Sequence, residues 1–156
     1  AYTLAKSERR ADNINNGDWY SFRFDRTHYL TLVVTHDFNE RFTLAGNFIY
    51  ATGEAVTAPV GTYTLNGNTL PLYSARNGVR IPAYHRADLS LTINRKKVEG
   101  KTYKNESNWV ISIYNIYGQK NVYSLSFQQN PDTGQNEIIK TYLFRLVPSV
   151  TYNFKF

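Results

Sequence analysis

The chain has 156 residues, a length that fits one domain with a hydrophobic core of ordinary depth. It has no cysteine, which excludes disulfides, thiol nucleophiles and cysteine-ligated metals, and no apolar run of the roughly 18 residues that a membrane helix needs. The net charge of +6 comes from Lys and Arg residues scattered along the chain, so the sequence does not predict a nucleic-acid partner. Because methionine is absent, we expect a processed or cut part of a longer chain.

The N-terminal third alternates between apolar and polar residues. Residues 2–6 are typical of the end of a strand, and residues 8–18 are typical of a polar loop. Apolar residues at every second position predict a long strand over 19–38 and a return strand over 41–51. The two residues between these strands, 39–40, are few enough for a tight hairpin turn.

The middle of the chain interrupts this pattern. Residues 52–83 are rich in Gly, Pro, Asn and Thr, and predict an irregular connection of about 30 residues. Alternation resumes over 86–94 and, after a polar link, over 108–114. The same phase continues over 117–127, where residues 118–121 are interpreted as a bulge.

The last fifteen residues, 142–156, show the clearest alternation, with only Leu143 and Val147 as apolar residues on the polar face. A single strand of about 15 residues is about three times the usual length, and it suits a tilted strand that crosses a bilayer and stands above it. The other interpretation is a long strand of a soluble sandwich or barrel. We predict that the apolar face contacts lipid.

The connections between the predicted strands differ in length. The turn at 39–40 is short, the loops at 8–18 and 52–83 are longer, and only the link at 131–136 departs from this alternation. Outer-membrane barrels have brief periplasmic turns and extended outer loops. We therefore expect the final strand to run downwards and the C-terminus to lie at the periplasmic side of a bacterial outer membrane.

Several segments occur in a familiar order. The chain resembles the C-terminal end of TonB-dependent outer-membrane receptors, most closely the type with an N-terminal carboxypeptidase-regulatory-like domain. The resemblance spans essentially the whole chain, 1–156, and rests on segments Tyr2 to Ser7, Phe24 to His28, Tyr50 to Gly53, Ile81 to Leu91, Ile113 to Tyr117 and Leu143 to Phe156.

The resemblance implies an all-β fold, an antiparallel transmembrane β-barrel segment supplying about five or six strands of a larger, 22-stranded barrel. It implies import of a nutrient (a peptide, a glycan or a metal chelate) driven by TonB, with no cofactor. Five or six strands cannot close a membrane barrel without leaving backbone groups unpaired in hydrocarbon. Further strands of the same receptor are therefore expected as partners. The resemblance also implies its plug, TonB through the missing N-terminal part, outer-membrane lipid and lipopolysaccharide, and a surface substrate-binding lipoprotein as partners.

Two acid and imidazole neighbours invite a catalytic interpretation, Asp25 with His28 and His85 with Asp88. Residues three apart on a strand point to opposite faces, so neither pair forms a hydrogen-bonded dyad without a bend. No two histidines stand together as metal ligands. We predict no catalytic, metal or cofactor site and no enzyme activity. With Arg26, His28 is instead expected at the outer rim, near the phosphates of lipopolysaccharide.

Three groups of residues are the candidate sites. Charged residues on the polar face line the lumen, either contacting substrate or plug or simply pairing across strands. Residues of the 52–83 connection contact substrate, since mobile loops commonly carry recognition. The terminal aromatic residues resemble a barrel-assembly signal. The lumen candidates are Arg23, Asp25, Arg41, Arg86, Asp88 and Arg145, the loop candidates are Tyr63, Tyr73, Arg76 and Arg80, and the signal is Tyr152, Phe154 and Phe156.

Two rival functions stay open. One is a small, self-contained β-barrel of about eight strands that binds an apolar ligand, and the other is an outer-membrane enzyme of barrel type. The small module requires apolar residues that point into a closed barrel, whereas the transporter segment requires Leu30, Phe48, Leu89 and Ile111 to point outwards. The enzyme requires His28 or His85 to share a pocket with Ser or Asp.

Overall fold

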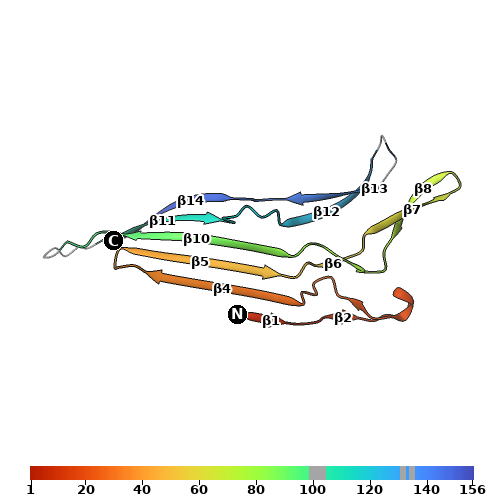
Figure 1. Ribbon diagram of the computed structural model, residues 1–156, viewed down its shortest axis with the longest axis horizontal. Helices are drawn as coiled ribbons and strands as arrows, with labels where there is room; N and C mark the ends of the chain where they lie inside the picture. Colours follow the sequence, from red (N-terminus) through yellow and green to blue (C-terminus); the bar gives the residue numbers. More distant parts are fainter. Residues whose placement is uncertain (99–104, 131–132, 134–135) are drawn as a thin grey trace.

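The main element is a six-stranded antiparallel sheet (Figure 1). The computed structural model describes residues 1–98, 105–130, 133 and 136–156. Each strand pairs with the strands nearest to it along the order β1-β4-β5-β10-β11-β14, which confirms the expected all-β antiparallel fold. The strands are β1 (Tyr2–Leu4), β4 (His28–Asp37), β5 (Phe42–Ala51), β10 (Tyr84–Asn94), β11 (Glu106–Tyr114) and β14 (Val147–Lys155).

Four two-stranded ladders extend the structure beyond one end of the sheet (Figure 1). We call this the loop end, and we call the opposite end, with residues 38–41, 95–98 and 105 and the C-terminus, the turn end. A 3-10 turn, η1 (Asn15–Gly17), also lies in the loop-end segments. The ladders are β2 (Glu8–Arg9) with β3 (Tyr20–Ser21), β6 (Ala55–Val56) with β9 (Val79–Arg80), β7 (Pro59–Leu65) with β8 (Asn68–Tyr73), and β12 (Val122–Gln129) with β13 (Asn136–Tyr142).

Two of the expected strands are interrupted at the loop end. The strand expected over 19–38 is broken at 22–27, so that β3 pairs with β2 and only β4 joins the main sheet. The single strand expected over 142–156 is wrong as well, since β13 and β14 belong to different sheets. Likewise, β12 does not continue β11 within the sheet.

The interruption between β13 and β14 results from the neighbouring segment, which connects β11 with β12. Tyr114 pairs with Val147 and Val122 pairs with Tyr142, so residues 115–121 of one segment face residues 143–146 of the other. The longer side folds into a turn in which Asn115 has a positive φ of 53° and its side chain bonds both the N–H and the C=O of Gln119. The facing residues then have no extended partner for ladder hydrogen bonds, although their own alternation is undisturbed.

The expected irregular connection over 52–83 is wrong in part, because it contains two ladders, β6·β9 and β7·β8. The turn of the β7–β8 hairpin is Asn66-Gly67, with φ values of 50° and 79°. Asn-Gly is the dipeptide that best tolerates two successive positive φ angles, as a tight hairpin requires. The hairpin projects away from the sheet (Figure 1).

The described residues have almost no hydrophobic core. The buried apolar residues are three alanines, Ala51, Ala55 and Ala58, while many large apolar side chains are exposed. The accessible surface is 11487 Å², whereas a compact monomer of this mass exposes about 8,000 Å². In the described residues, no helix has the length and hydrophobicity needed to cross a membrane. The sheet is a single layer that does not close on itself.

Candidate functional site

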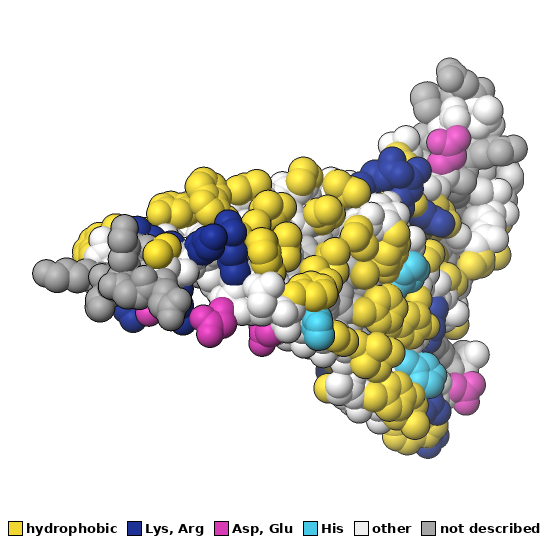
Figure 2. All heavy atoms as spheres, turned by 60° about the vertical axis from the view of Figure 1, so that its left-hand side comes forward, with side chains coloured by type: hydrophobic (Ala, Val, Ile, Leu, Met, Phe, Trp, Pro, Cys, Tyr) yellow, Lys and Arg dark blue, Asp and Glu magenta, His cyan; other side chains and the backbone are white. Residues whose placement is uncertain are grey.

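One face of the sheet is apolar from strand to strand. The register aligns Val34, Gly46, Leu89, Ile113 and Pro148 in one row across five strands. The next row on the same face holds His36, Leu44, Leu91, Ile111 and Val150. Figure 2 shows hydrophobic side chains covering most of the sheet on the face in view. Antiparallel pairing has therefore combined separate alternating strands into one continuous apolar surface.

The opposite face carries mainly small polar residues. The row between the two apolar rows holds Thr35, Ala45, Ser90, Ser112 and Ser149, and the hydroxyls of the last two lie 2.7 Å apart. Nearer the turn end, Asn94, Asn108 and Asn153 are aligned, and the amide of Asn153 donates to Asn108 Oδ1 at 2.8 Å. Side chains of this kind are suited to contact with water.

Aromatic rings border the apolar face at the turn end. Trp109 and Tyr152 are directly paired, with ring centroids 4.7 Å apart. Phe154 stacks on Tyr152 at 6.5 Å and meets Phe156 edge-on at 5.3 Å. The three residues of the expected assembly signal thus form one series of exposed rings. Phe42 lies in the same register row as Trp109.

Two tyrosine–histidine pairs border the same face at the loop end. The Tyr2 hydroxyl lies 2.8 Å from Nδ1 of His28, and the Tyr117 hydroxyl lies 2.9 Å from Nδ1 of His85. The rings of each pair are stacked. Tyr50 lies between them, since it pairs with Leu30 on β4 and with His85 on β10. Rings with an apolar body and a polar tip therefore occur at both borders, Trp109 and Tyr152 at the turn end and the tyrosines and histidines at the loop end.

Neither histidine bonds the carboxylate that is near it in sequence. Asp25 accepts hydrogen bonds from Arg80 and from the N–H of Ser7. Asp88 pairs with Arg86 at 3.0 Å and accepts the N–H of Asn115 at 2.9 Å. Among the described residues, no group of three or more His, Asp and Glu side chains could hold a metal ion.

A buried ion pair organises the loop end. Asp25 is 2% exposed, and its carboxylate is paired with the guanidinium of Arg80. The same guanidinium donates to the carbonyl oxygens of Asp25 and Gly53, each at 3.0 Å. Burial opposes ionisation of Asp25, but Arg80 and the N–H of Ser7 outweigh it and hold the pKa of this carboxyl below its usual value. The pair ties the segment before β4 to β6 and β9.

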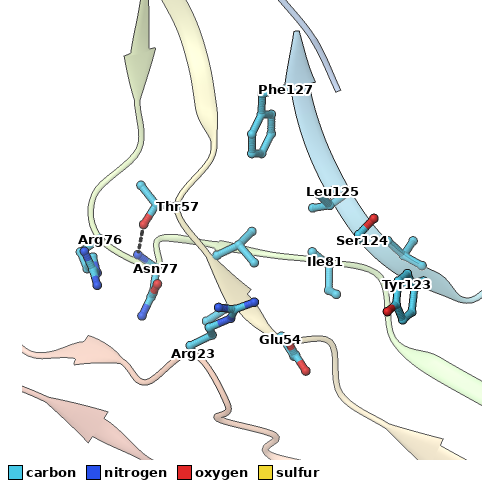
Figure 3. Close-up of a pocket in the computed structure, with 13 residues that line it drawn as sticks. Arg23, Glu54, Thr57, Arg76, Asn77, Ile81, Tyr123, Ser124, Leu125 and Phe127 are labelled. Carbon is cyan, nitrogen blue, oxygen red and sulfur yellow. Dashed lines mark hydrogen bonds between the residues drawn. The ribbon is translucent and has the colours of Figure 1, made fainter. Parts of the chain in front are cut away.

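A cavity of about 390 Å³ opens among the loop-end segments (Figure 3). It lies between the 54–57 segment, the 76–81 segment and β12. Figure 3 shows Arg23 reaching into the space from one side and Phe127 from the other. Its lining residues include Arg23, Glu54, Thr57, Arg76, Asn77, Ile81, Tyr123, Ser124, Leu125 and Phe127.

The predicted site residues are spread over different environments. Of the lumen candidates, Arg86 and Asp88 project from the sheet on its polar face, whereas the other four lie in connections. Arg26, expected at the rim facing phosphates, pairs with Glu54 at 2.8 Å. Arg80 belongs to the buried ion pair, while Arg76 lines the cavity. The other two loop candidates, Tyr63 and Tyr73, are exposed on the β7–β8 hairpin.

The residues that hold the backbone beside the cavity were not among the predicted site residues. Asn15 holds the backbone of Arg76 from 61 positions away, accepting its N–H at 2.7 Å and donating to its C=O at 3.2 Å. The side-chain amide of Asn77 donates to the Ser21 carbonyl oxygen at 2.9 Å, and the backbone N–H of Asn77 donates to the Thr57 hydroxyl at 3.0 Å. Asparagine in a loop is too common to identify such long-range contacts in advance.

A scan against models of known protein families, a search of curated proteins and a search of solved structures each found no match.

Proposed function

We propose that this chain is the C-terminal wall of an outer-membrane β-barrel transporter of the TonB-dependent type. In this proposal the apolar face contacts lipid, the polar face borders an aqueous lumen, and the loop end is extracellular. The free edges at β1 and β14 pair with the remaining strands of the same receptor. The plug and the contact with TonB belong to the rest of that receptor, and a surface lipoprotein that binds substrate is a further partner.

The observation that carries the proposal is the apolar face, aligned by register over five strands. Eight residues separate Phe42 from Tyr50 on β5. At about 3.3 Å per residue and a tilt of about 40°, that distance is about 20 Å along the membrane normal, near the apolar band of about 25 Å in such barrels. Rings with polar tips at both borders match the aromatic belts at the two membrane interfaces.

The positions of the connections support the same proposal. The extensions 5–27 and 52–83 and the described residues of 115–146 lie at the loop end, while fewer residues connect the strands at the turn end. Outer-membrane barrels distribute their outer loops and periplasmic turns in this way. A soluble sandwich needs a second layer over the apolar face, and a small binding module needs a closed barrel. The described residues form neither of these.

Membrane extraction of the full-length protein tests the proposal. Cells expressing it are fractionated, and the membranes are washed with alkaline carbonate and then with detergent. We expect the protein to stay with the outer-membrane fraction through the carbonate wash and to be released as a monomer by detergent. A protein recovered in the wash, soluble and monodisperse without detergent, would contradict the proposal.

A further inference from the structure

We infer that the loop-end cavity binds a small ligand that has a sugar-sized ring and a carboxylate. This inference deepens the proposed function, on which it rests for the ligand's access from outside the cell. The residues that line the cavity belong to no strand of the main sheet.

The charge of the cavity favours an anion. Two arginine residues, Arg23 and Arg76, line it, and in the described part of the chain neither forms an ion pair. Glu54, the one carboxylate among the described lining residues, is already neutralised by Arg26 at 2.8 Å. Two unpaired guanidiniums beside a neutralised carboxylate leave a net positive site. The planar fork of an arginine matches a carboxylate with two parallel hydrogen bonds.

The backbone around Arg76 is fixed before any ligand arrives. The two hydrogen bonds from Asn15 hold its peptide groups, and the next residue, Asn77, is held by Thr57 and Ser21. The Arg80–Asp25 pair fixes the strand that follows. A site assembled in advance loses less conformational entropy when its ligand binds.

The opposite wall of the cavity is apolar and aromatic. Ile81, Leu125 and Phe127 line it, with Tyr123 and the hydroxyl of Ser124 beside them. A volume of about 390 Å³ is near the lower limit for ligand sites, which suits one or two sugar rings. A bare phosphate would leave the aromatic wall without contact. The combination of arginines and an apolar wall therefore favours a carboxylate attached to a ring.

Isothermal titration calorimetry on the full-length protein in detergent tests the inference. The ring carboxylates are methyl glucuronide, methyl galacturonide and N-acetylneuraminic acid, and the comparison ligands are the methyl ester of the glucuronide, glucose 6-sulfate and inorganic phosphate. We expect at least one ring carboxylate to bind at least about tenfold more tightly than the ester, because hydrogen bonds to charged groups contribute strongly.

Three variants locate the site. Arg23→Gln and Arg76→Gln each remove one guanidinium from the cavity and are expected to weaken binding about tenfold or more. Lys96→Gln removes the same charge at the turn end and is expected to leave binding within about twofold of the parent. The three variants should show the same far-ultraviolet circular dichroism as the parent.

Four results would overturn the inference. The first is that no ring carboxylate binds, and the second is that the ester binds as tightly as the ring carboxylates. The third is that the sulfate or phosphate binds as tightly as the ring carboxylates or more tightly, and the fourth is that both arginine variants bind as tightly as the parent. Any of these can occur while the protein still behaves as an integral membrane protein in the extraction experiment. The failure of this inference is thus distinguishable from the failure of the proposed function.

Discussion

The sheet and the loop end are built by different interactions. In the sheet, one rule repeats, since every second residue faces the same side and antiparallel pairing aligns these residues over five strands. At the loop end, single polar contacts join residues far apart in sequence, such as Asp25 with Arg80 and Asn15 with Arg76. The stability of the sheet should therefore depend on whether a substituted side chain is apolar or charged. The stability of the loop end should depend on which individual residue is replaced.

The largest expected effect is in the sheet. Leu89→Arg places a charge in the central row of the apolar face, and we expect it to cost about 2–4 kcal/mol in folding into a bilayer. Ser90→Arg, on the neighbouring position of the same strand, faces the polar side and should cost less than about 1 kcal/mol. The measurement is urea unfolding of the reconstituted protein. Equal destabilisation by the two substitutions would contradict a lipid-facing surface.

Two glycine substitutions, one at the loop end and one in the sheet, are expected to differ in their cost in stability. A Cβ on Gly53 would lie 1.8 Å from the carbonyl oxygen of Ile81, so backbone must move, and we expect Gly53→Ala to cost about 2–3 kcal/mol. On Gly46 in the sheet, a Cβ would lie 3.8 Å from Leu89, which is ordinary contact. Gly46→Ala should be nearly neutral. Thermal unfolding of both variants measures the difference, and similar losses would refute the close approach at Gly53.

Asp25→Asn tests the buried ion pair. Because the side chain of Arg80 is 35% exposed, solvent screens the pair and we expect a loss of about 1–2 kcal/mol, confined to the loop end. The carboxyl has a pKa below its usual 3.8, so its contribution is present above about pH 4 and is lost as the pH falls through the folded-state pKa.

Hydrogen exchange of the loop-end segments, corrected for intrinsic rates, measures this effect at pH 6 and pH 3. The parent should lose protection at the lower pH, while the variant should already be less protected at pH 6 and change less. Exchange in β5 and β10 serves as the internal control. A variant with the parent's full pH dependence would show that another group is responsible.

The smallest expected effect concerns the rim. Tyr117→Phe removes the hydroxyl that lies 2.9 Å from His85 but keeps the ring. One exposed hydrogen bond is expected to contribute about 0.5 kcal/mol. Thermal unfolding against the parent measures it, with Tyr63→Phe on the exposed hairpin as the matched control. A loss above about 2 kcal/mol would mean that the pair has a structural role beyond the border of the apolar face.

The sequence predicted the repetitive region well and the specific region poorly. The alternation around Leu44 and Leu91 depends only on local order, so the two faces could be assigned before the strands were paired. The break between Tyr142 and Val147 could not, since it results from the turn at Asn115 on a neighbouring segment.

The loop-end contacts depend on partners that the sequence does not mark. Arg76 and Arg80 are equivalent as residues of one connection, yet one lines a cavity and the other is held by Asp25. The Asn66-Gly67 turn was a readable signal for the β7–β8 hairpin, because Asn-Gly between two extended segments predicts a tight turn.

Spin labelling at two neighbouring positions of β10 shows whether the two faces of the sheet contact lipid and water. The 156 residues of the chain contain no cysteine. Leu91→Cys and Thr92→Cys can therefore each carry a nitroxide in the full-length protein, after any cysteines outside this chain have been replaced and the protein has been reconstituted in liposomes. Collisions with oxygen, which concentrates in lipid, are compared with collisions with a water-soluble nickel chelate. We predict that position 91 is reached by oxygen and shielded from nickel, and that position 92 shows the reverse. Nickel access to position 91, or shielding of that position from both reagents, would contradict it.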